Sequence, residues 1–172
     1  SYTLYTSSTT DSTTNPAGVA GSVSGACLSC HDGSIAIDVL ANVGGAAFST
    51  GVAFTVQAGA TGAKATYGTI APGTNNVMNG GIPFVGTDLR NDHPVNIIYE
   101  TARLATTTEF VTQNPGAKVT VGAGTPLPLY GSATATATVE SASCHNPHNN
   151  TNDNFLRVSN AGSALCLKCH IK

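Results

Sequence analysis

The sequence has no long hydrophobic run. A helix that crosses the hydrocarbon core of a bilayer needs about 18 or more consecutive apolar residues, and no run in these 172 residues approaches that length. The first residues, Ser1–Tyr5, also lack the basic start and the apolar middle of a secretory signal peptide. We therefore expect no transmembrane segment, and a chain that is either a mature form or a fragment.

Charged side chains are scarce as well. Aspartate, glutamate, lysine and arginine make up 9% of the residues, and the formal net charge is −2. The few lysines and arginines form no basic stripe, and there is no acidic tail. A nucleic acid is therefore not an expected partner.

Large apolar side chains are sparse too. There is no tryptophan, and serine, threonine, glycine, alanine and asparagine dominate, with 19 glycines. A core built from such side chains alone would be thin for the length of the chain. Low hydrophobicity indicates disorder when a high net charge accompanies it, and that charge is missing here.

Two short motifs supply the main chemical signal. The segments 27–31 and 166–170 both have the pattern C-x-x-C-H. Two cysteines at this spacing can form thioethers with the two vinyl groups of one haem, and the histidine that follows is then an axial ligand of its iron. A buried porphyrin would also add the apolar area that the side chains lack. The expected haem-binding residues are Cys27, Cys30 and His31 in the first motif and Cys166, Cys169 and His170 in the second.

A third, partial motif lies at 141–145. Ser141 takes the place of the first cysteine, and Cys144 and His145 follow at the usual spacing. A haem here could keep one thioether through Cys144 and use His145 as a ligand. The alternative is a buried thiol beside a structural histidine. The haem hypothesis uses all five cysteines of the chain, two in the first motif, one in the partial motif and two in the last.

Other uses of the cysteines explain less of the sequence. Disulfides within Cys27–Cys30 and Cys166–Cys169 would close very short loops, which gain little from a cross-link. A zinc site could combine cysteine pairs, but three histidines that directly follow cysteines would have no role. A thioredoxin-like redox pair needs a βαβ context, which the sequence does not show.

The remaining histidines are candidates for the opposite faces of the haems. His93 stands outside any Cys-His pair, and Pro94 biases it towards an extended backbone. We expect it to be a distal ligand, with the haem of Cys27 and His31 as its best match. His148 lies only three positions after His145, too few to reach the other face of the same haem. If both are ligands, they serve different irons, and two haems lie close together.

The number of ligands is one short. Three haems need six axial ligands, and the sequence has five histidines. The missing ligand could be Met78, or a histidine upstream of this chain. Otherwise, one haem would be open.

The expected fold is mostly irregular coil with short β-strands and a few short helices, organised around covalently bound haems. A small β-element and a C-terminal helix complete it. We predict one multihaem cytochrome c domain over 1–172, in which 1–26 form an extended arm rich in serine and threonine. The expected elements are a helical turn at 27–33 ended by Asp32-Gly33, strands at 48–57, 95–99 and 132–140, a short helical turn near 109–113 and a helix over 164–170.

Several stretches together resemble a known family. They are residues 2–9, 27–33, 88–95, 127–131, 144–148 and 155–170. On these stretches the chain resembles the multihaem cytochromes with doubled C-x-x-C-H motifs of metal-reducing and syntrophic bacteria. The resemblance implies electron transfer through closely stacked haems with two axial histidines, and some such proteins polymerise into extracellular filaments. Ser141 departs from the family pattern, and so does the start of the chain, because family members tend to carry a further C-x-x-C-H-x-P-H segment upstream.

The function expected from these features is electron transfer by about three haem c groups per chain, without enzymatic activity. Covalent haem attachment is normally completed outside the cytoplasm, so we expect an extracellular location, with the periplasm as the alternative. The expected partners are further copies in a homopolymer, other redox proteins and extracellular electron acceptors. The alternatives are a soluble periplasmic electron shuttle and a haem reductase with one open iron.

Overall fold

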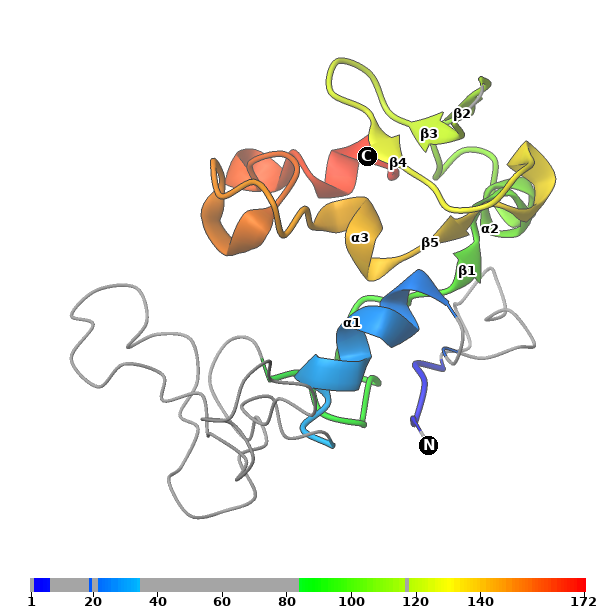
Figure 1. Ribbon diagram of the computed structural model, residues 1–172. Coiled ribbons are helices and arrows are strands. Elements are labelled where there is room, and N and C mark those ends of the chain that lie inside the picture. The colour runs from blue at the N-terminus through cyan, green and yellow to red at the C-terminus, as the bar shows by residue number, and fades with distance from the viewer. Residues whose placement is uncertain (1, 7–18, 20–21, 35–83, 117) are drawn as a thin grey trace, which may run out of the picture. The chain divides into compact units, whose positions relative to one another are not determined.

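The computed structural model describes residues 2–6, 19, 22–34, 84–116 and 118–172 (Figure 1). The strand expected at 48–57 and Met78 lie outside these residues. Contacts divide the chain into two compact units. Unit 1 consists of Ser1–Thr3 and Ala26–Leu89, and unit 2 of Leu4–Gly25 and Arg90–Lys172. The single-domain organisation stays a prediction.

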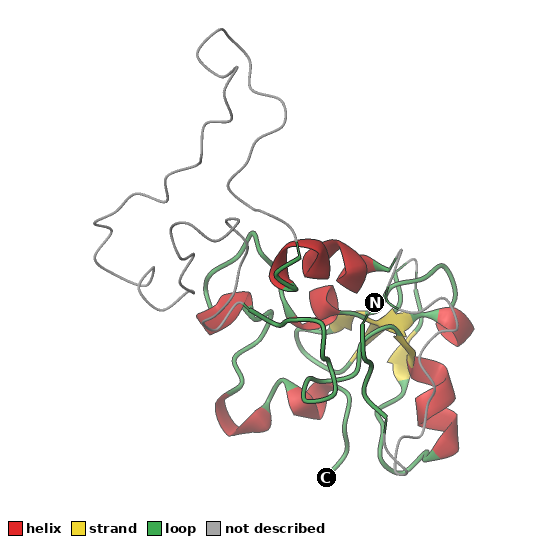
Figure 2. Cartoon of the chain, turned by 90° about the horizontal axis from the view of Figure 1, so that it is seen from below, coloured by secondary structure: helices red, strands yellow, loops and turns green. Residues whose placement is uncertain are grey.

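The described elements are short and separated by loops and turns (Figure 2). The α-helices are α1 (Val23–His31), α2 (Tyr99–Ala105) and α3 (Ser141–Cys144). The strands are β1 (Ile97–Ile98), β2 (Gln113–Asn114), β3 (Thr120–Val121), β4 (Leu127–Pro128) and β5 (Thr138–Val139), and the 3-10 turns are η3 (Thr134–Thr136), η4 (Asp153–Phe155), η5 (Ala161–Ser163) and η6 (Cys166–Lys168). This architecture confirms the predicted fold class. Among the described residues, no helix has the length and apolar character needed to cross a membrane.

Helix α1 has one buried stripe. Ser24 and Leu28 lie four residues apart on one face of the helix, and Asp32 continues this spacing just after its last residue. All three residues are buried. The helix begins at Val23, four residues before the expected turn, and so includes the end of the predicted arm. It ends as expected at Asp32-Gly33, where Gly33 has a φ of +74° that glycine adopts without strain.

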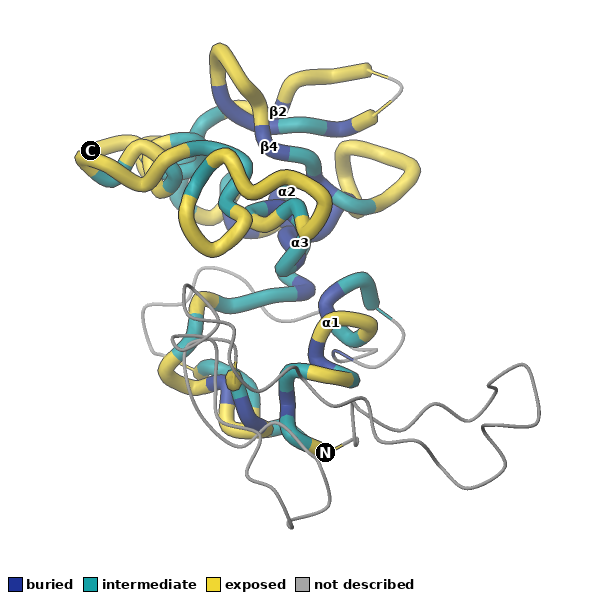
Figure 3. Tube along the Cα trace, turned by 60° about the vertical axis from the view of Figure 1, so that its left-hand side comes forward, coloured by how far each residue is buried: buried dark blue, intermediate teal, exposed yellow. Residues whose placement is uncertain are grey.

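The hydrophobic core of unit 2 joins two small sheets (Figure 3). Strand β1 pairs with β5, and β2, β3 and β4 form an antiparallel meander. The core residues are Tyr99, Val119, Val121, Leu127, Leu129, Ala137 and Val139. Gly131 allows the chain to turn back here, because its φ is +147° and a Cβ would lie 2.9 Å from Ala137 Cα.

Three expected elements differ from the structure. The strand at 95–99 is reduced to β1, because Asn96 has a φ of +56° and Tyr99 already begins α2. The strand at 132–140 is reduced to β5, since η3 takes up its first half. The prediction of a helical turn near 109–113 was wrong. Phe110 instead forms an isolated antiparallel bridge with His170, and Gln113 begins β2.

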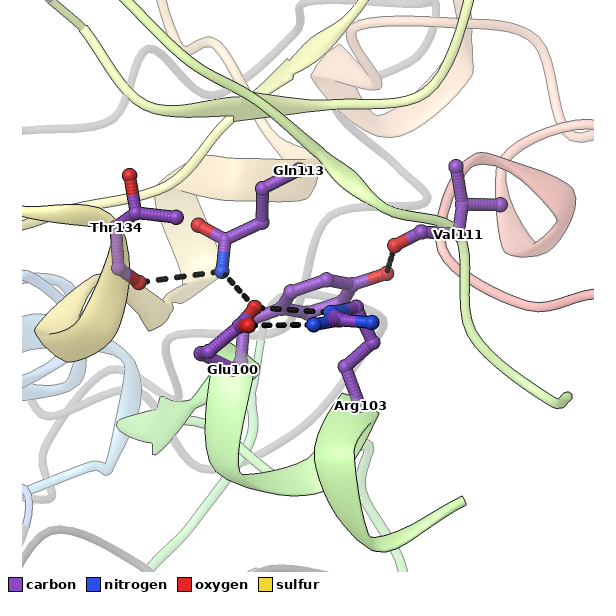
Figure 4. Close-up of polar contacts among 6 residues, drawn as sticks. Glu100, Arg103, Val111, Gln113 and Thr134 are labelled. Carbon is purple, nitrogen blue, oxygen red and sulfur yellow. Dashed lines mark hydrogen bonds and ion pairs between the residues drawn. The ribbon is translucent and has the colours of Figure 1, made fainter. Parts of the chain in front are cut away.

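A polar network connects α2 to β2 and η3 (Figure 4). Arg103 donates to both carboxylate oxygens of Glu100, at 2.6 and 2.9 Å. Gln113 Nε2 donates to Glu100 Oε2 at 2.8 Å and to the carbonyl oxygen of Thr134 at 3.1 Å. The hydrogen bond from Arg103 lowers the pKa of Glu100, burial opposes it, and Gln113 adds to the lowering. The network therefore stabilises unit 2 above the ordinary carboxylate pKa and weakens as pH falls through the lowered value.

In unit 1 the N-terminal segment packs beside the end of α1. Tyr2 donates its hydroxyl to Asp32 Oδ2 at 2.6 Å, and both the amide and the hydroxyl of Ser34 donate to Asp32 Oδ1. Burial alone would raise the pKa of Asp32, but the bonds from Ser34 and Tyr2 lower it. The hydrogen bond to Asp32, together with burial and the charge of Asp32, raises the pKa of Tyr2 to about 12.

Tyr2→Phe is expected to lower the free energy of unfolding by about 1 kcal/mol at neutral pH, because it removes the hydrogen bond to Asp32. The raised pKa of Tyr2 means that its contribution is present below pH 10 and is lost as pH rises towards 12. In the variant, the free energy of unfolding should lack this decrease between pH 10 and pH 12. Urea unfolding from pH 7 to 12 measures both effects, with Tyr5→Phe as the matched control. Equal alkaline losses in Tyr2→Phe and the wild type would contradict the prediction.

Candidate haem-binding site

Helix α1 brings the first motif to one side. Cys27, Cys30 and His31 occupy positions i, i+3 and i+4 of a continuous helix, so they share a face. Both cysteines are exposed, and His31 is half-buried, whereas Leu28 between them is 4% exposed. The carbonyl oxygen of His31 accepts hydrogen bonds from the amides of Val85 and Gly86 within unit 1. The motif thus combines a fixed backbone with accessible sulfurs.

The C-terminal motif has the same local shape in a shorter element. The expected helix over 164–170 is present as the 3-10 turn η6, and right-handed helical backbone continues through Cys169. The amide of His170 donates to the carbonyl oxygen of Cys166 at 2.9 Å, closing one helical turn. We call the segment 166–170 the C-terminal haem turn.

Two backbone hydrogen bonds hold the C-terminal haem turn against an extended segment. The amide of Val111 donates to the carbonyl oxygen of Cys169 at 2.9 Å, and the amide of Ile171 donates to that of Glu109 at 2.8 Å. His170 and Phe110 are therefore bridge partners. The bonds explain why the segment after Glu109 is extended, since a helical turn there would use these backbone groups within itself rather than in bonds to Cys169 and Ile171.

The partial motif repeats this arrangement, and we call 141–145 the Ser141 haem turn. The amide of His145 donates to the carbonyl oxygen of Ser141 at 3.0 Å, just as His170 donates to Cys166. The amide of Arg157 donates to the carbonyl oxygen of Cys144, and the amide of Asn146 donates to that of Phe155. His145 and Leu156 are thus bridge partners, as His170 and Phe110 are.

The two turns therefore share one backbone design. Each has a helical hydrogen bond from the histidine to the residue four positions earlier, and each histidine lies in an antiparallel bridge. Ser141 occupies the structural position of Cys166. Serine at this position is therefore compatible with the same backbone hydrogen bond, although 141–144 is α-helical and 166–168 is a 3-10 turn.

The sulfurs of the two turns lie close enough for their charges to interact. Burial raises the pKa of the Cys144 thiol, and the Cys166 thiolate adds to this. Burial raises the pKa of Cys169 to about 12, with smaller contributions from Cys144 and Cys166. Cys169 also packs against the hydrophobic core of unit 2. The two turns thus face a common region of unit 2.

Two histidines have one ring nitrogen fixed by a backbone carbonyl. His93 Nδ1 lies 2.9 Å from the carbonyl oxygen of Pro94, and His145 Nδ1 lies 2.8 Å from that of Asn154. A carbonyl only accepts, so Nδ1 carries the proton and Nε2 keeps its lone pair. Metal-ligating histidines are commonly held in this way. Both side chains are exposed.

The other two histidines of unit 2 differ in their surroundings. The ring centroids of His93 and His170 are 6.5 Å apart at an interplanar angle of 68°, and the Phe110 ring lies 4.9 Å from that of His170. Burial lowers the pKa of His170, and the charge of His93 lowers it further. His148 is exposed, and its amide donates to Asn146 Oδ1.

Tyr99 supports the C-terminal haem turn from the core. Its hydroxyl lies 2.7 Å from the carbonyl oxygen of Val111 and 3.1 Å from that of Cys169. Tyr130 has the matching place at the Ser141 haem turn, where its hydroxyl donates to the carbonyl oxygen of Ala142 at 3.3 Å. Neither tyrosine was among the residues expected from sequence, because nothing in a motif marks a distant hydroxyl.

Tyr99→Phe is expected to loosen the C-terminal haem turn alone. Losing the hydroxyl should cost about 1 kcal/mol of unfolding free energy and should speed hydrogen exchange of the Val111 amide. Tyr130→Phe is the matched control, since it should affect the Arg157 amide at the other turn. Exchange measured by NMR separates the two, and equal acceleration of both amides in either variant would contradict the prediction.

Glu140 is the main structural residue that sequence reasoning missed. It is the last residue of the strand expected at 132–140, where no buried charge was predicted, yet it is 2% exposed. Its carboxylate accepts hydrogen bonds from the amide and hydroxyl of Ser24 and from the hydroxyl of Thr138. It also caps α3 in a reciprocal pair of bonds with Ser143. The usual capping-box signature has Ser or Thr at the N-cap and Glu or Gln three residues later, so the reversed order Glu140 and Ser143 gave no such signal.

All five cysteines lie within the described residues, and none of them forms a disulfide. Within the same part of the chain, no three side chains of histidine, cysteine, aspartate or glutamate gather to hold a single metal ion. The donor set instead suits haem, with thiols at turn spacing and histidines whose ring protons are directed to carbonyls. Cysteines 27, 30, 144, 166 and 169 would hold the porphyrins, with histidines at the irons.

Comparison with known families agrees with this chemistry. The family model described as the doubled CXXCH motif matches residues 138–172. The C-terminal segment is thus similar to a doubled CXXCH motif, with Ser141 in place of one cysteine. The match includes both haem turns, the one with Ser141 among them, and supports a c-type cytochrome-like protein that binds haem c covalently. No curated protein matches the chain.

Proposed function

We propose that the chain is an electron conduit that carries about three haem c groups and works outside the cytoplasm. The observation that carries the proposal is the repeat of two haem turns that are held in unit 2 by equivalent backbone hydrogen bonds and bridges. When bound, haem supplies a one-electron couple at its iron. Two such turns within one compact unit favour transfer between their haems.

The protein residues would do three things in this role. The cysteines would anchor the porphyrin edges and the histidines would hold the irons, with the rings of His93 and His145 oriented by backbone carbonyls. Tyr99 and Tyr130 keep the turns against the core. Because lysine and arginine total seven, hydroxyl, amide and backbone N–H groups would share the hydrogen bonding of the haem propionates.

An extracellular location and assembly into a homopolymer that passes electrons to external acceptors rest on the resemblance to filament-forming multihaem cytochromes. Electron micrographs of purified haem-loaded protein test the filament. Particles without polymers would favour the periplasmic shuttle. The alternative of a haem reductase is favoured by the ligand count, since five histidines cannot close three haems. A high-spin fraction that binds carbon monoxide or nitrite would support it.

The primary test of the proposal is the haem content. A pyridine haemochrome assay together with intact mass should find two or three covalent haems per chain. Serine substitutions at Cys27 and Cys30, or at Cys166 and Cys169, should each remove one. A protein matured in a cytochrome-competent host that carries no haem would exclude the proposed function.

A further inference from the structure

We propose that His93 and His170 are the two axial ligands of one iron, that of the haem attached through Cys166 and Cys169. This inference rests on the proposed function, and it names the distal ligand of one particular haem. It replaces the assignment expected from sequence, in which His93 serves the haem of Cys27 and His31.

The separation of the two rings supports the pairing. A metal–imidazole bond is about 2.0 Å long, and the centre of an imidazole ring lies about 1.1 Å from each of its atoms. Two imidazoles bound to opposite sides of one metal therefore have centres about 6.2 Å apart. The His93 and His170 centroids are 6.5 Å apart. Edge-to-face ring contacts span about 4.5–7 Å, and within that range the observed separation lies close to the value expected for shared coordination.

The state of the His93 ring fits a ligand. Its Nδ1–H bond to the carbonyl oxygen of Pro94 leaves Nε2 unprotonated, which is the form that binds iron. The side chain is exposed and hence accessible to a cofactor. The bond is made to the next residue, so it orients the ring without help from distant elements.

His170 is held by contacts of its own. Backbone bonds on both flanks fix its position against Phe110, and the Phe110 ring packs on the imidazole with centroids 4.9 Å apart. One histidine is thus set by a strand bridge and a ring contact, the other by a local carbonyl. Both belong to unit 2.

The pairing changes the account of the ligands. With His93 and His170 on one iron, His31 and His145 remain as proximal ligands for two irons. His148 is then the one histidine of this sequence without an assignment. The haem with incomplete histidine ligation must therefore be sought at the other two attachment sites.

The experiment combines His93→Ala with removal of one haem at a time. In the haem-loaded full chain, His93→Ala should convert one haem from low-spin to high-spin, seen in optical and EPR spectra and as new carbon monoxide binding. The conversion should persist in a background with serine at 27 and 30. It should be absent from a background with serine at 166 and 169. Asn91→Ala, on the same exposed turn, is the matched control and should change nothing.

A second variant separates ligation from folding. His93→Met should restore a low-spin haem with a higher reduction potential, since thioether ligation raises it. An unchanged spectrum of His93→Ala would overturn the inference. So would a conversion that requires Cys27 and Cys30 rather than Cys166 and Cys169. Both outcomes would leave the proposed function intact, because it fails only if the chain carries no covalent haem.

Discussion

Glu140→Ala is expected to lower the free energy of unfolding by about 3 kcal/mol, because it removes a buried carboxylate that several donors share. The amide and hydroxyl of Ser24 and the hydroxyl of Thr138 would lose their acceptor inside unit 2. The cap of α3 would be lost with it. Because α3 is the helical part of the Ser141 haem turn, the turn itself should loosen. Urea unfolding measures the free energy, and hydrogen exchange of the His145 amide reports the turn.

The control for this variant is Glu109→Ala. Glu109 is exposed, and the hydrogen bond that it accepts from the amide of Ile171 is made to its backbone carbonyl and does not involve its side chain. The change should therefore stay within about 0.5 kcal/mol. Glu140→Gln should fall between the two, since the amide keeps one acceptor oxygen. Equal stabilities of Glu140→Ala and Glu109→Ala would show that the buried hydrogen bonds contribute nothing.

The haem motifs were predictable because their chemistry depends on local spacing. Positions i, i+3 and i+4 of a helical turn share a face whatever surrounds them. The helical turn at Cys27–His31 and its end at Gly33 follow from that rule and from the conformational freedom of glycine. The general fold class followed from composition, since scattered glycine and short apolar runs favour short elements.

The errors arose where distant segments decide the conformation. Residues 109–113 have a composition that tolerates a helical turn, but bonds to Cys169 and Ile171, about 60 residues away, hold them extended. The strand pattern at 132–140 could not indicate the burial of Glu140. Its burial depends on Ser24, which lies 116 positions away along the chain. Neither partner can be inferred from a local pattern.

The equivalence of the two haem turns leads to the second large expected effect, a gain of a covalent bond. Ser141→Cys should give the haem at Cys144 and His145 a second thioether, because Ser141 occupies the backbone position of Cys166. Saturation of the remaining vinyl group shortens the conjugated system of that porphyrin. The α-band of its pyridine haemochrome should therefore move to a shorter wavelength. The wild-type protein should show one such long-wavelength haem among about three.

Thiol titration supplies the independent measurement. If each of the five native cysteines is in a thioether, the wild-type protein has no reactive thiol after denaturation, and Ser141→Cys should also have none. Ser159→Cys is the matched control, because Ser159 is exposed and lies outside both turns. That variant should gain one titratable thiol and keep the wild-type spectrum. A free thiol and an unchanged α-band in Ser141→Cys would mean that the shared backbone does not place position 141 against a porphyrin. The resemblance between the turns would then be one of backbone alone.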